Sequence, residues 1–183
     1  MTLRLLLEDR RQDVLADWHK RSQAVHSEGM RALMGRGGDQ FSNPVKGVLD
    51  EATASLYAAL LEGADREELV LVLDTPVRLL ALQGLTPSQA VGFVFELKHA
   101  VRHVLGKEIG KRGLEREVLA LEQRIDEAAL VAFDGYMGCR EQLLRLRTND
   151  ERRTTLSYLK RAGLEVSTDA ASSEGAGQRG ANG

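Results

Sequence analysis

Apolar residues recur every three or four positions along most of the chain, which is the spacing of one face of an α-helix. The pattern is clearest after Gly84. Thr86 is suited to cap a helix, Pro87 to occupy its first position, and Gln89 to complete a capping box. The apolar face that follows predicts a helix packed between other helices. Its members are Ala90, Phe93, Val94, Leu97, Ala100, Val101, Val104 and Leu105.

The rest of the chain shows the same helical period, divided by glycine and proline. Pro44 suits the start of a helix after Asn43, whereas Pro76 predicts a break. We interpret 106–113 as a basic connection bounded by glycines. The expected helices cover residues 2–34 with a break near 7–9, then about 44–61, 65–73, 77–83, 86–105, 114–147 and 151–162.

The longest expected helix has an apolar stripe without interruption. The stripe consists of Leu114, Val118, Leu121, Ile125, Ala128, Ala132, Tyr136, Cys139, Leu143 and Leu146, and it is widened by Leu119, Leu130, Phe133, Met137 and Leu144. Cys139 is therefore expected to be a packed, unreactive thiol. Gly135 and Gly138 lie inside this helix, where each costs about 1 kcal/mol relative to alanine. We interpret them as a close approach by a crossing helix or a second subunit.

Composition agrees with a helical protein. The 183 residues are rich in Leu, Ala, Glu and Arg, and they predict one all-α domain of six to seven helices over 1–164, with a disordered tail over 165–183. Lys and Arg number 25 against 27 Asp and Glu, so no basic field favours nucleic acid. No apolar run approaches the roughly 18 residues that span a bilayer, and 3–7 is too short for a signal peptide. We expect a cytoplasmic protein without membrane insertion.

Two groups of residues do not fit a simple division of each helix into one apolar and one polar face. Val91 and Phe95 fall beside Lys98 and Arg102, off the main face of their helix. We interpret these four residues as a second contact surface, for a partner or another copy of the chain.

Asp126 and Arg140 fall within the apolar arc of the longest helix, where an unpaired charge is costly. Each is expected to pair with another helix and fix its register, although a pocket or switch is the alternative interpretation. The candidate partners are Arg78, Lys98 and Arg102 for Asp126, and Asp74, Glu96 and the loop at Asp39 for Arg140.

Three stretches of the sequence, taken in order, resemble those of a known protein family. They are Phe41-Ser42-Asn43-Pro44-Val45, then Thr86-Pro87-Ser88-Gln89-Ala90-Val91 running to Leu97-Lys98, and Ile125-Asp126 to Ala132-Phe133-Asp134 with Tyr136-Met137 and Cys139-Arg140-Glu141. Over roughly 10–147 the chain resembles the N-terminal sensor domain of the RsbRD-type RsbT co-antagonists, the stressosome proteins.

The resemblance implies a bacterial regulatory input domain rather than an enzyme, with a globin-like fold that lacks haem and pairs as a homodimer. Its relatives continue into a STAS domain, for which the 36 residues after Arg147 are too few, so we expect a free-standing sensor domain that acts on another regulatory protein. The expected mechanism is a population shift at the dimer interface. No catalytic residue, metal or cofactor is expected.

Exposed histidines leave other functions open. His99 and His103 lie one helical turn apart with Glu96 nearby, a spacing that suits a metal or haem site, although all three fall on a polar face. Haem would need a buried ligand, and His26 is the histidine on an apolar edge. A histidine phosphotransfer module using His99 or His103 is a further alternative, although the glycine usual near its histidine is missing.

Overall fold

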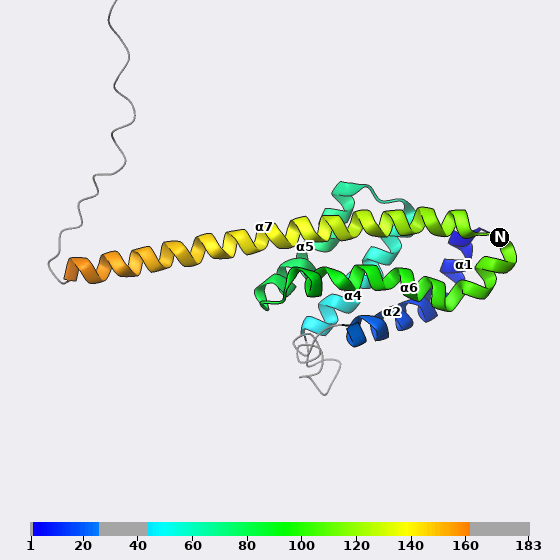
Figure 1. Ribbon diagram of the computed structural model, residues 1–183, viewed down its shortest axis with the longest axis horizontal. Coiled ribbons are helices and arrows are strands. Elements are labelled where there is room, and N and C mark those ends of the chain that lie inside the picture. The colour runs from blue at the N-terminus through cyan, green and yellow to red at the C-terminus, as the bar shows by residue number, and fades with distance from the viewer. Residues whose placement is uncertain (1, 26–43, 162–183) are drawn as a thin grey trace, which may run out of the picture. The chain divides into compact units, whose positions relative to one another are not determined.

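The computed structural model describes residues 2–25 and 44–161, and within these residues it contains helices and no strand. The helices are α1 (Leu3–Asp9), α2 (Arg11–Val25), α4 (Pro44–Glu62), α5 (Arg66–Leu82), α6 (Pro87–Arg112) and α7 (Glu115–Arg161) (Figure 1). The all-α prediction is confirmed. The break expected near 7–9 occurs at Arg10, and the predicted cap Asn43, the rest of the first helical pattern and the tail over 165–183 lie outside the described residues.

Local capping explains where α5 and α6 begin. The Asp65 carboxylate accepts a hydrogen bond from the Glu68 backbone N–H at 2.9 Å, and the Glu68 side chain bonds back to Asp65. The Thr86 hydroxyl and the Gln89 side chain form the same reciprocal pair at the start of α6, with Pro87 in the first turn. The predicted capping box at Thr86 is confirmed, and Asp65 forms a second one; each depends on residues only three positions apart.

Two predicted helix ends are wrong. α5 continues through Pro76, which is buried together with Leu73 and Val77, and this burial outweighs the lost backbone hydrogen bond. α6 continues through the predicted connection at 106–113 to Arg112, because Ile109 is buried against the core. It ends where Gly113 adopts φ 67°, a left-handed conformation that favours glycine at a helix C-terminus.

Hydrogen bonds from large buried side chains join the helices in residues Met1–Glu141, which form one packed unit. Trp18 of α2 donates to the Phe93 carbonyl of α6 at 2.6 Å, and Tyr57 of α4 donates to the Leu7 carbonyl of α1 at 2.9 Å. Burial of the Tyr57 ring raises the pKa of its hydroxyl above the ordinary value. Tyr136 of α7 donates to the Leu85 carbonyl, just before α6.

α7 begins in the unit Met1–Glu141, where it contacts α4, and continues into a second unit, Gln142–Gly183. Arg124 hydrogen-bonds the Leu60 and Ala64 carbonyls, and so caps the C-terminal end of α4. In the second unit, Gln142–Gly183, the described residues continue α7 as far as Arg161, so the expected separate helix at 151–162 is wrong. Leu144 and Leu146 are exposed here, which corrects their assignment to the buried stripe.

No helix in the described residues combines the length and apolar character needed to cross a bilayer.

Candidate functional site

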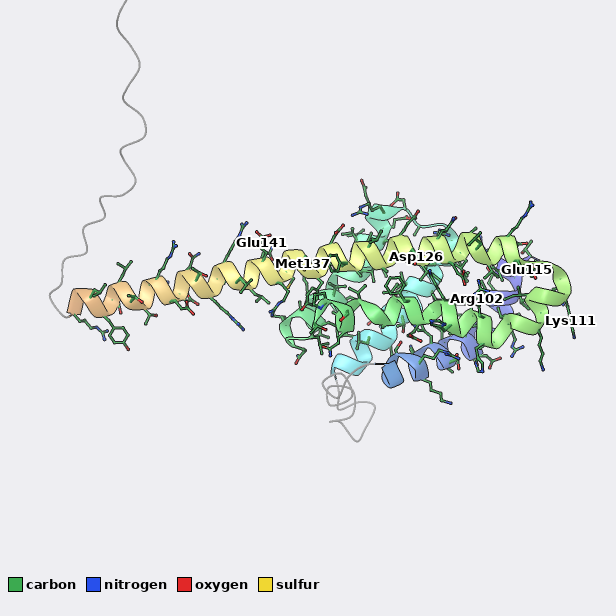
Figure 2. All side chains as sticks on the ribbon, in the orientation of Figure 1. Arg102, Lys111, Glu115, Asp126, Met137 and Glu141 are labelled. Carbon is green, nitrogen blue, oxygen red and sulfur yellow. The ribbon has the colours of Figure 1, made fainter. Side chains whose placement is uncertain are left out.

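Two ion pairs fix how α6 and α7 lie against each other. Lys98 of α6 pairs with Asp126 of α7 at 2.6 Å, and Arg102 pairs with Glu122 through two hydrogen bonds of 2.5 and 2.8 Å. Figure 2 labels Arg102 on α6 and Asp126 on α7. The hydrogen bonds to Glu122 raise the pKa of the Arg102 guanidinium. The step from Lys98 to Arg102 along α6 corresponds to the step from Asp126 back to Glu122 along α7. The two helices are therefore antiparallel, in a register that these two pairs define. This register places Phe95 opposite residues 129–130.

The predicted pair between Lys98 and Asp126 is thus present, but the charge is not buried. Asp126 has 49% of its side chain exposed, and Arg140 is half-buried. Arg140 forms no ion pair with the described residues, and its candidate partner Asp74 instead pairs with Arg78 at 2.7 Å. Both residues lie at the border between the core and solvent, because the buried face of α7 is narrower than its apolar pattern suggests.

Among the large apolar side chains that remain accessible on α6 and α7, four belong to one candidate surface. Phe95, Leu130, Phe133 and Met137 are between 42% and 62% exposed, and we call them the α6/α7 apolar surface. The prediction that the last three widen the buried stripe of α7 is wrong. Their spacing of three and then four residues defines a stripe separate from the buried one, and that spacing could have identified it. Figure 2 shows Met137 farther along α7 than Asp126.

Val91 does not belong to this surface. The prediction that Val91 shares a second contact surface with Phe95 is wrong, because Val91 is only 6% exposed and is part of the hydrophobic core. The apolar face of α6 is therefore wider than the expected arc. Of the predicted interface residues, the structure brings Phe95, Lys98 and Arg102 together beside Asp126.

Gly135 and Gly138 of α7, the other two predicted interface residues, are not part of the α6/α7 apolar surface. A Cβ atom on Gly135 would meet Val77 of α5 at 3.6 Å, an ordinary contact, and a Cβ atom on Gly138 would meet nothing within 4 Å. Gly135 borders a hollow of about 160 Å³ between α5 and α7, whose rim carries the Arg66–Asp134 ion pair of 2.7 Å. Within the protomer, neither glycine is required by a close approach of another helix.

We predict that Gly135→Ala raises the free energy of unfolding by about 0.5–1 kcal/mol, because alanine restricts the unfolded chain and favours the helix. Urea unfolding followed by circular dichroism measures the change. Gly138→Ala is the matched variant and should behave alike, since space is free at both positions. A loss of stability in either variant would show that the glycine serves a contact outside the protomer.

The histidines are placed separately. His99 is exposed, as the helical pattern predicted, and exposed His103 lies 3.1 Å from Asp17 of α2. His19 of α2 contacts the buried Thr53 hydroxyl at 2.6 Å. No group of three or more potential metal ligands forms within 2–25 and 44–161, and His26 lies outside these ranges.

Cys139 is partly buried and packs against the core, as predicted, and its lack of reactivity stays a prediction.

Comparison with known proteins gives one family. Residues 12–150, more than half of the chain, match the model of the RsbT co-antagonist protein rsbRD N-terminal domain. No curated protein matches the chain, and no solved structure matches it either. The globin-like arrangement of the helices therefore stays a prediction. The matched range contains α4, α5 and α6 entire, together with the α6/α7 apolar surface. The chain therefore belongs to the RsbT co-antagonist protein rsbRD N-terminal domain family.

Proposed function

We propose that this domain transmits a signal through protein contact rather than catalysis, and that two copies pair through the α6/α7 apolar surface. Its family is one of stress-signalling regulator domains. The observation that carries the proposal is the cluster of four accessible large apolar side chains on two adjacent helices. Contiguous exposed apolar surface of this kind marks protein interaction sites.

The charges beside this surface favour a second copy of the chain as its occupant. Asp126, Phe133 and Arg140 are seven residues apart on one face of α7, and Leu130 and Met137 repeat the same interval beside them. A two-fold axis at Phe133 would place Phe133 against its own copy. It would also place Leu130 near Met137 of the partner subunit, and Asp126 near Arg140 of the partner subunit. One patch is then complementary to itself, as a two-fold interface requires.

The same residues supply a means of regulation. Asp126 pairs with Lys98 inside the protomer but keeps about half of its side chain exposed, so the carboxylate can also face a partner. Lys98 in turn lies over the Phe95 ring, 5.9 Å from its centroid. A ligand or regulatory protein that favours one arrangement of these side chains would shift the population between paired and separate domains.

Charge reversal tests this pairing. We expect Asp126→Arg and Arg140→Asp each to raise the dimer dissociation constant by about tenfold or more, because like charges would then face each other across the interface. The double variant restores opposite charges and should recover most of the affinity. Sedimentation velocity over a concentration series measures all four proteins.

Glu67→Arg is the control, because Glu67 is exposed on α5, which contributes no residue to the α6/α7 apolar surface, and its reversal should leave the dissociation constant unchanged. A wild-type protein that stays monomeric at the highest concentration refutes the pairing. Two single variants whose defects add in the double variant refute the two-fold register, even if the protein is a dimer.

A further inference from the structure

A groove between α4 and α5 lies apart from the surface proposed for pairing. These helices are joined by a short connection that includes Gly63 and Asp65, and side chains from both line an open hollow of about 360 Å³. This volume falls at the lower end of the range of about 300–1,000 Å³ that is typical of small-molecule sites. The hollow beside Gly135, at about 160 Å³, is smaller than that range.

Pro76 gives the groove an unusual backbone acceptor. A proline inside a helix has no N–H to donate to the carbonyl four residues earlier, so the Val72 carbonyl loses its usual partner. Both Val72 and Pro76 line the groove. The Val72 carbonyl thus lacks its helical donor, and in our proposal a donor in the groove takes that place.

The polar side chains of the groove can all accept hydrogen bonds, and one of them, Glu51, is a carboxylate. Glu51 and Ser55 lie one turn apart on α4, and Thr75 faces them from α5. None of the three side chains forms a hydrogen bond or ion pair with the described residues, and no basic side chain from this part of the chain lines the groove. The local formal charge is thus negative, and a ligand that carries donors and a positive charge is favoured.

The remainder of the lining is apolar. Leu71 is 77% exposed, the largest exposed fraction among the exposed large apolar side chains of the described residues, and it lines the groove beside Val72 and Pro76. An aliphatic segment of a ligand would cover this side chain and remove its apolar area from water.

We infer that the α4/α5 groove binds a small organic cation, a protonated primary amine with a short aliphatic chain. An ammonium group has three donors. The Glu51 carboxylate, the Val72 carbonyl and a hydroxyl of Ser55 or Thr75 supply three acceptors, while Leu71 contacts the aliphatic chain. The inference does not depend on the proposed pairing, because α4 and α5 contribute no residue to the α6/α7 apolar surface.

Titration of the ¹⁵N-labelled protein with pentylamine tests the site. We expect saturable amide shifts confined to 48–55 and 71–77, and none from pentanoate, which has the same chain but a negative charge. Pentanol separates charge from apolar contact, and we expect its binding to be much weaker. Equal shifts with pentanoate or pentanol, or shifts spread over the whole domain, would overturn the inference.

Variants then locate the cation. Glu51→Gln should weaken pentylamine binding by about fivefold, the value expected for one partly exposed ion pair. Glu127→Gln, an exposed glutamate on α7, should leave binding unchanged, and circular dichroism establishes that both variants are folded. Unchanged affinity in Glu51→Gln would refute the role of this groove. A monomeric protein that still binds pentylamine would refute only the pairing.

Discussion

Replacing Trp18 with alanine is expected to lower the free energy of unfolding by about 3–5 kcal/mol. The Trp18 side chain is fully buried, and its ring stacks on Phe93 with centroids 6.4 Å apart. Its Nε1–H donates to the Phe93 carbonyl at 2.6 Å, so one side chain supplies both packing and a hydrogen bond between α2 and α6. A loss of that size is a large fraction of the roughly 5–15 kcal/mol that stabilises an ordinary domain.

Trp18→Phe separates these two contributions. Phenylalanine retains most of the apolar contact but has no N–H, so we expect a smaller loss of about 1–2 kcal/mol. Urea unfolding followed by circular dichroism measures both variants against the wild type. A Trp18→Ala loss below about 1 kcal/mol would place Trp18 outside the core, because buried tryptophan truncations cost more than that.

Local signals in the sequence predicted the starts of helices well. The capping boxes at Asp65–Glu68 and Thr86–Gln89 are present because each is formed by side chains within one helical turn. Helix ends depended instead on distant contacts. Pro76 and the glycines at 106 and 110 disfavour helix locally, but the helices that contain them bury Val77 and Ile109, and a local rule does not include that burial.

The candidate site was predictable only in part for a similar reason. α7 carries two apolar stripes, one through Ile125 and Tyr136 and the other through Leu130 and Met137. Helical periodicity shows that both exist, but the packing of α5 and α6 decides which one is covered. Lys98 is one of three candidate partners that the sequence indicates for Asp126, because an unpaired charge within an apolar arc is costly, and packing selects Lys98 among them. The exposure of Asp126 could not be predicted before the covered stripe was known.

The second large change in stability is expected from substitution of Val91, a residue of α6 that faces the core. We predict that Val91→Asp lowers the free energy of unfolding by about 3–5 kcal/mol, since a carboxylate without a partner would replace a side chain that is 6% exposed. Phe95→Asp should change the stability by less than about 1 kcal/mol, because Phe95 is 42% exposed and a carboxylate there lies near Lys98.

The two variants differ by one helical turn and introduce the same charge, so each is the control for the other. Chemical unfolding at low protein concentration, where pairing is negligible, compares their monomer stabilities. The destabilisation by Val91→Asp should shrink at acidic pH, where the buried carboxyl is neutral and its desolvation costs less. The reverse order of stability would mean that α6 is rotated about its axis by roughly 40°, the angle between residues four positions apart, and Phe95 would then belong to the core instead of the surface that we propose for pairing.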